Sequence, residues 1–96
     1  METESAYEEE LGIELGDQMV QKGHLVQIPA DLRREHDLSL CYIDAAVGVG
    51  DRSFPLTDAW VNAEGQLNIP KGKREIYGVE YGDRVDLKVE GVVYRE

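Results

Sequence analysis

The order of features in residues 18–49 recurs in residues 58–93, and this internal repeat constrains the fold more than any other property of the chain. Each segment predicts a strand, an Ile-Pro step, a short charged helix and a second alternating strand. At an offset of 41 residues the matched pairs are Val20 and Val61, Ile28 and Ile69, Pro29 and Pro70, and Arg33 and Arg74. We therefore interpret the chain as a duplication, with repeat one at 18–49 and repeat two at 58–93.

One copy of this unit is too small to fold alone. About 35 residues with two strands and one helical turn cannot bury their own apolar face. Each copy therefore needs a partner copy, supplied either by the other half of the same chain or by a second chain. The expected fold class is mostly β, a small α+β barrel of two pseudo-symmetric repeats with short helices.

Length and composition exclude several classes of protein. The 96 residues fit one folded domain, and no run of 18 apolar residues is available to span a membrane. Cys41 is the only cysteine, so neither an intramolecular disulfide nor a cluster of thiolate ligands can form. His24 and His36 have no spacing that would pair them with Cys41 as a catalytic group. We expect no enzyme, no catalytic residues, no metal, no cofactor and no membrane partner, and a cytoplasmic protein.

The chain carries 20 acidic and 10 basic residues, a net charge of −10. Residues 1–16 hold six of the acids and no base, so we expect an acidic N-terminal tail over 1–16, either solvated or forming a short helix, and a barrel over 17–96. The excess of acid speaks against a generic nucleic-acid binder. It is also typical of proteins from a halophilic archaeon, where molar salt screens self-repulsion.

The segment from Glu64 to Val85 closely resembles the AbrB/MazE/SpoVT swapped-hairpin family. It reads Gly65, Gln-Leu-Asn, Ile69-Pro70, a basic residue, Arg74-Glu75, a short helix and then Gly82-Asp83 before an alternating strand. The first half matches more loosely. His24 stands where the glycine should be, one residue after Gly23, and Cys41-Tyr42 replaces Gly-Asp. The resemblance implies a swapped-hairpin, AbrB-like β-barrel that holds two tandem copies in one chain.

The resemblance also implies a transcriptional regulator that binds double-stranded DNA. Basic residues near the Ile-Pro helix starts would contact phosphate, with two amides on the exposed strand face as hydrogen-bonding neighbours. The expected DNA-binding residues are Lys22, Arg33, Arg34, Lys71, Lys73, Arg74, Gln66 and Asn68. For the two aligned arginines a structural role, pairing with carboxylates such as Asp83 or capping helix carbonyls, stays open. A pseudo-two-fold barrel would present both basic clusters on one side.

Two alternatives use protein partners instead of DNA. In a MazE-like antitoxin the acidic segment would cover a basic toxin. In a protein-interaction module the barrel would have lost DNA contact altogether. The sequence also leaves open whether two chains pair as a homodimer despite the duplication.

Overall fold

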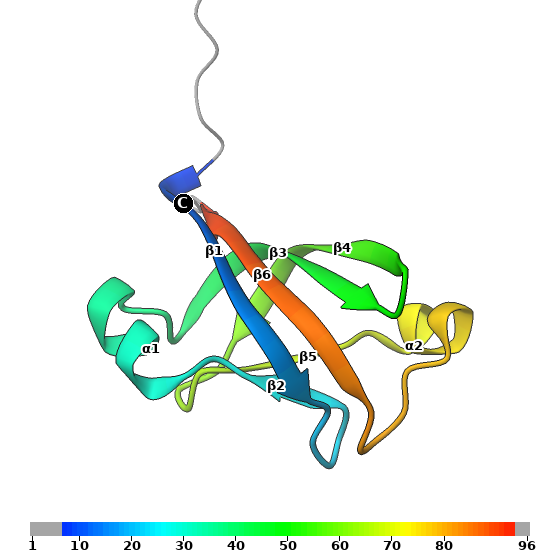
Figure 1. Cartoon of the computed structure of the whole chain (residues 1–96). Helices are drawn as coiled ribbons and strands as arrows, with labels where there is room; N and C mark the ends of the chain where they lie inside the picture. Colours follow the sequence, from blue (N-terminus) through cyan, green and yellow to red (C-terminus); the bar gives the residue numbers. More distant parts are fainter. Residues whose placement is uncertain (1–6, 94–96) are drawn as a thin grey trace, which may run out of the picture.

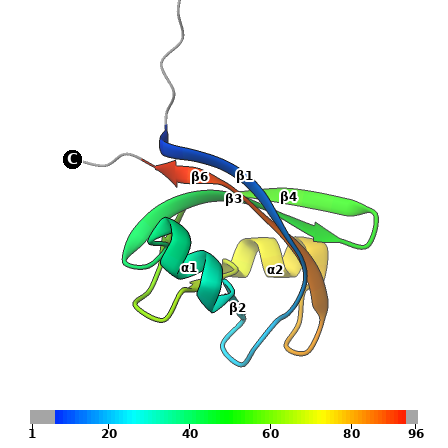
Figure 2. The same ribbon diagram turned by 60° about the vertical axis from the view of Figure 1, so that its left-hand side comes forward.

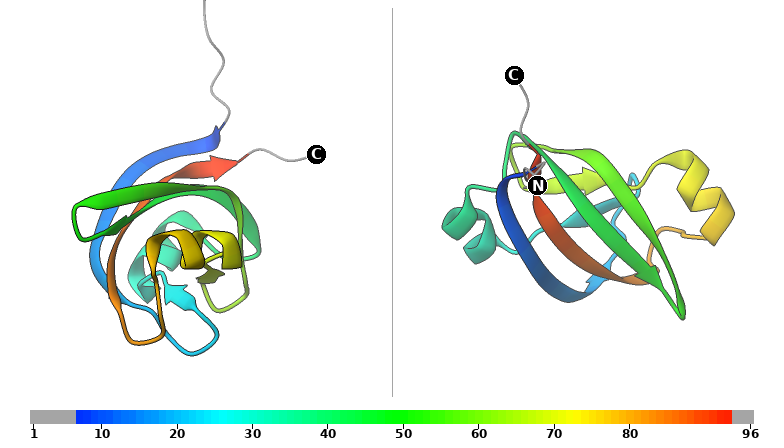
Figure 3. Two further views of the ribbon diagram at one scale, coloured as in Figure 1. Left: turned by 90° about the vertical axis from the view of Figure 1, so that its right-hand side faces the viewer. Right: turned by 90° about the horizontal axis from the view of Figure 1, so that it is seen from above.

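Six strands and two short helices make up the computed structural model, which describes residues 7 to 93 (Figure 1). Their order along the chain is β1 (Tyr7–Met19), β2 (Leu25–Gln27), α1 (Ala30–His36), β3 (Cys41–Val49), β4 (Arg52–Val61), β5 (Gln66–Asn68), α2 (Lys71–Tyr77) and β6 (Arg84–Val93). The strands form one curled antiparallel sheet in the order β1-β6-β3-β4-β5-β2 (Figure 3). The expected mostly-β fold with short helices is confirmed.

The two halves of the chain build the same four elements in the same order, so β1 corresponds to β4, β2 to β5, α1 to α2 and β3 to β6. Strands of one half pair with strands of the other: β1 with β6, β3 with β6, and β2 with β5. Val26 and Leu67 occupy equivalent positions and face each other across the β2–β5 pair. A local two-fold axis therefore passes between them, and the two predicted pseudo-symmetric repeats are confirmed.

Two reciprocal backbone hydrogen bonds interlock the repeats beside the helices. Ile28 N donates to Gly65 O at 2.9 Å, and Ile69 N donates to His24 O at 3.0 Å. Because Ile28 is equivalent to Ile69 and His24 to Gly65, this is one contact made twice, once in each direction. The hairpins are thus interleaved within a single chain.

The core draws on both repeats, because one repeat alone cannot bury its own apolar face. Its buried residues form one cluster made of Val20, Val26, Ile28, Leu38, Ile43, Ala45, Val47, Phe54, Leu56, Val61, Leu67, Ile69, Val79, Val85, Leu87, Val89 and Val92. The helices contribute no fully buried residue, and only Leu32 and Tyr77 pack partly against this cluster. They therefore cover the rim of the core, and most of their surface is available to solvent.

Each helix is seven residues long and follows directly on a proline. Pro29 and Pro70, at φ −55° and −60°, are the N-caps, so the helices themselves begin at Ala30 and Lys71. Proline fits there because its missing N–H has no helical acceptor to lose. At the other end, Asp37 and Gly78 adopt left-handed φ values of 56° and 67° and close the last turn. Within residues 7 to 93, neither helix is long and apolar enough to cross a membrane.

The expected acidic tail over residues 1–16 is wrong for residues 7–16, which belong to β1 and pair with β6; residues 1–6 lie outside the described part of the chain. The half-buried side chains of Leu11, Ile13 and Leu15 alternate with exposed positions, as a strand with one covered face requires. Gly12 and Gly16 have positive φ at two of the three places where the ladder shifts register. The repeats consequently begin earlier than expected, at β1 and at β4.

The connection between β3 and β4 is short. Only Gly50 and Asp51 form a turn, and Arg52 already pairs with Val49 in a β3–β4 hairpin. Pro55 lies within β4, paired with Ala46. This hairpin connects the two repeats.

Candidate nucleic-acid interface

The start of α2 in repeat two is fixed against the β1–β2 turn of repeat one. Arg74 Nη1 donates to His24 Nδ1 at 2.7 Å, and Asn68 Nδ2 donates to Gly23 O at 2.9 Å. The bond from Arg74 requires the Nδ1 atom of His24 to be unprotonated, since guanidinium can only donate. These contacts join residues about 45 to 50 positions apart in the sequence.

Around this junction lies a set of cationic and imidazole side chains that we call the α2 corner: Lys22, His24, Lys71 and Arg74. His24, Lys71 and Arg74 line one open hollow of about 350 Å³, with Glu75 and Glu80 also on its wall. Lys22 is exposed in the turn immediately before Gly23. Repeat one thus supplies two members of the α2 corner, and repeat two supplies the other two.

The equivalent place in the other half, which we call the α1 corner, consists of Ala63, Gly65, Ala30 and Arg33. Here the stem of Arg33 lies directly on Gly65, where a Cβ would overlap Arg33 Cδ. Gly65 also has a φ of +77°, which favours glycine. Ala63 and Ala30 replace the two lysines of the α2 corner.

Arg33 and Arg74 are half-buried, and the Nε atom of each is buried without a hydrogen-bond partner among the described residues. Their aliphatic stems pack in the contact between repeats. Asp83, the carboxylate considered as a partner, accepts a hydrogen bond from Glu80 N at 2.9 Å instead. These contacts support a structural role for both arginines, and phosphate contact by them stays a prediction.

The two amides expected at the DNA face have partners within the fold. Gln66 is half-buried; its Oε1 accepts from Asn62 Nδ2 at 3.2 Å, and its Nε2 donates to Gln21 Oε1 at 3.4 Å. Asn68 is exposed and, as described above, donates to the turn of repeat one. Both amides help to shape the turns on which the basic residues stand.

Lys73 and Arg34 lie apart from the α2 corner. Lys73 is half-buried, with Nζ 5.8 Å from the centroid of the Phe54 ring, and it lines a second hollow of about 460 Å³ together with Trp60 and Pro70. Arg34 is exposed on α1.

The two helices lie at opposite ends of the β2–β5 pair (Figures 1 and 3). In the view of Figure 2 both are seen on the same side of the layer formed by β1, β6, β3 and β4. The sequence grouped Lys22 with Arg33 and Arg34 as the basic cluster of the first half. In the structure the turn that carries Lys22 contacts repeat two instead, through Gly23 and His24. His24 lies in the contact between repeats, and its correspondence with Gly65 at an offset of 41 was the available sequence signal for this place.

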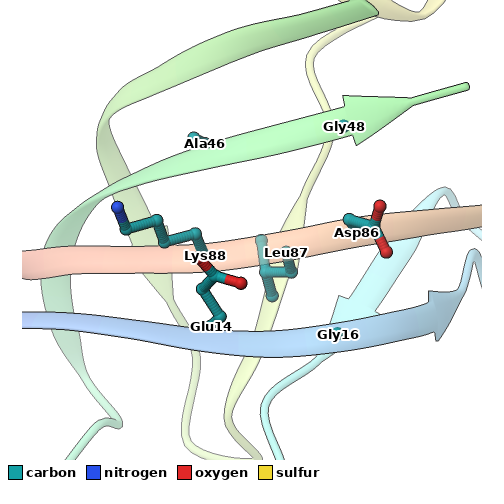
Figure 4. A pocket seen from close by; sticks show the side chains of 7 residues that line it. All are labelled: Glu14, Gly16, Ala46, Gly48, Asp86, Leu87 and Lys88. Atoms are coloured by element: carbon teal, nitrogen blue, oxygen red, sulfur yellow. The ribbon is translucent and has the colours of Figure 1, made fainter. Parts of the chain in front are cut away.

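The opposite, outer face of the sheet carries a hollow of about 270 Å³ (Figure 4). Its floor includes Gly16, Ala46 and Gly48, and the charged side chains of Glu14, Asp86 and Lys88 stand around it. Acids outnumber bases here, so this face is less suited to phosphate than the α2 corner. Among the described residues no group of three His, Cys, Asp or Glu side chains could hold a metal ion.

No family model matches the chain, and no curated protein matches it. Among solved structures it is similar to the solution structure of PHS018 from Pyrococcus horikoshii, with a TM-score of 0.70 and 19% sequence identity. The similarity covers 88% of this chain and 95% of that chain. At this level of identity the likeness shows a shared fold.

Proposed function

We propose that the protein is a cytoplasmic transcriptional regulator of the AbrB/SpoVT type that binds double-stranded DNA. The observation that carries the proposal is the exchange of turns between repeats, which brings Lys71 and Arg74 together with His24 on one hollow, with Lys22 exposed in the same turn as His24. In a chain with a net charge of −10, such a gathering makes a local site for anionic phosphate. The resemblance of residues 64–85 to the swapped-hairpin family agrees with this use of the helix starts.

The arrangement of the helices suits a duplex. The two helix starts are related by the local two-fold axis and flank the β2–β5 pair (Figure 1). Proteins that read duplex DNA commonly present symmetry-related elements to successive stretches of the groove. In this proposal Lys22 and Lys71 contact phosphate, Lys73, Arg33, Arg34 and Arg74 lie beside the duplex, and Gln66 and Asn68 support the turns.

Salt decides how tightly such a site can bind. Counterion release contributes little affinity in molar salt, so shape complementarity and direct hydrogen bonds must supply the rest. Binding should therefore be measured at low and at molar KCl, with the protein's folding checked in each.

The test is retention of genomic fragments by the purified protein in molar KCl, followed by sequencing of the retained DNA. The proposal expects a shared sequence among the retained fragments. It also expects Lys71→Gln/Lys73→Gln to lose retention, while Ser53→Glu/Lys88→Gln, with the same change in net charge on the sheet, keeps it. Retention of no fragment by the wild-type protein, or equal loss in both variants, would contradict the proposal.

The antitoxin alternative has lost its structural support. It used residues 1–16 as a free acidic segment, whereas residues 7–16 are part of the sheet. Co-purification of a stoichiometric basic protein in place of DNA would reinstate it.

A further inference from the structure

The two corners occupy equivalent places in the fold but differ in charge. Lys22 corresponds to Ala63 and Lys71 to Ala30, and all four positions are exposed. Four further pairs differ in charge: Lys73 and Leu32, Gly72 and Asp31, Gly23 and Glu64, and, in the opposite sense, Glu75 and Arg34.

The difference persists when the neighbouring positions are counted. Over residues 22–24 and 71–75, four bases stand against one acid; over the equivalent residues 63–65 and 30–34, two bases stand against two acids. One end of the molecule is therefore cationic, while its symmetry mate is neutral. Phosphate would be attracted to the first end and gain nothing from the second.

The packing of the arginines adds to this asymmetry. At the α1 corner the Arg33 stem covers Gly65. Two acidic residues are next to this corner in the sequence, since Glu64 directly precedes Gly65 and Asp31 directly follows Ala30. At the α2 corner Arg74 is tethered to His24, and Lys71 lines the same hollow, whose wall also carries Glu75 and Glu80. The two corners therefore share one backbone arrangement, but the excess of cations is at the α2 corner.

From these observations we infer that the chain holds one phosphate-binding site, the α2 corner, composed of the repeat-one turn and the repeat-two helix. This inference rests on the proposed function and narrows it, because the α1 corner takes no part in binding the duplex phosphates. A single chain then covers one half-site. An operator with two-fold symmetry would take two chains, one for each half-site.

The experiment compares two double variants that change the net charge equally. Lys22→Gln/Lys71→Gln removes two cations from the α2 corner, and Ala30→Glu/Ala63→Glu adds two anions at the equivalent positions. Binding is measured by fluorescence anisotropy over a range of KCl concentrations, on a duplex of about 20 base pairs cut from a retained genomic fragment, a length that spans two half-sites. Urea unfolding followed by the fluorescence of Trp60, the only tryptophan, confirms that both variants are folded.

We expect Lys22→Gln/Lys71→Gln to weaken binding by about tenfold or more at low salt and to lower the slope of log K against log salt by about 2, since two phosphate contacts are lost. Ala30→Glu/Ala63→Glu should bind within about twofold of wild type with the same slope. Equal losses in the two variants, or a larger loss in the alanine variant, would overturn the single-site inference while leaving DNA binding in place. Failure of the wild-type protein to bind any duplex would instead overturn the proposed function.

Discussion

Arg33 lies on Gly65 in one half of the molecule, and its equivalent Arg74 donates a hydrogen bond to His24, the equivalent of Gly65, in the other half. The same contact between repeats has thus been built in two ways. In one contact Gly65, which has no side chain, leaves room for the aliphatic stem of Arg33. In the other, the imidazole of His24 accepts a hydrogen bond from the guanidinium of Arg74. This compensation explains how histidine at position 24 takes the place that glycine holds at position 65.

Gly65→Ala should destabilise the protein. The new Cβ overlaps the Arg33 stem, and alanine is strained at a φ of +77°. We expect a loss of about 2–3 kcal/mol in the free energy of unfolding, part of it recovered in Gly65→Ala/Arg33→Ala because the overlap is gone. Urea unfolding of the four proteins in this double-mutant cycle measures the coupling, and additive losses would contradict the contact.

The two turns that lead into β3 and β6 predict a stabilising substitution. Leu40 has a φ of 54° and is 63% exposed, whereas repeat two has Gly82 at a φ of 91° in the corresponding turn. Leu40→Gly should therefore raise the free energy of unfolding by about 0.5–1 kcal/mol, since the relief of strain outweighs the added freedom of the unfolded chain. Asp37→Gly should gain less, because aspartate tolerates this conformation better. A loss of stability in Leu40→Gly, measured by urea unfolding, would show that the leucine side chain holds the turn.

The place of β1 in the sheet can be checked with neighbouring residues. Leu15 packs partly against the core, and Glu14 beside it is exposed. Leu15→Ala should cost about 1–2 kcal/mol, while Glu14→Ala stays within about 0.5 kcal/mol of wild type. Thermal unfolding separates the two outcomes. If this segment were a free tail instead of a strand, both substitutions would have equal and negligible effects on stability.

Stability should rise with salt. Between about 0.1 M and about 1 M KCl the screening length falls from about 10 Å to about 3 Å, which weakens repulsion within a chain of net charge −10. The midpoint of thermal unfolding should therefore increase over this range. Glu14→Gln/Asp86→Asn, which removes two acids beside the hollow of Figure 4, should reduce the increase. A midpoint that does not depend on salt would contradict the expected halophilic adaptation.

The sequence predicted the parts of the fold that are encoded locally. The Ile-Pro steps at residues 28–29 and 69–70 located both helices, and the offset of 41 residues predicted the pseudo-symmetric repeats. The strand β1 was missed because Tyr7, Leu11 and Leu15 are spaced by four, which suggests a helix, and because its partner β6 lies far along the chain.

The candidate site was harder to predict for a related reason. The turn of Lys22 and His24 meets Arg74 and Asn68 only through contacts across the two repeats, and no local pattern reports which turn contacts which helix. Trp60 shows a similar limit. Its large aromatic side chain suggests burial, but Trp60 is 46% exposed, with its ring 5.0 Å from that of Tyr42.

Titration of the ¹⁵N-labelled protein with the duplex from a retained fragment, followed by amide chemical shifts, tests the central claim most directly. We predict that shifts concentrate on residues 21–24 and 68–75, which surround the α2 corner, and that residues 30–34 and 63–65 move little. Shifts confined to the outer face of the sheet, or no shifts with any duplex at low or molar KCl, would contradict the account.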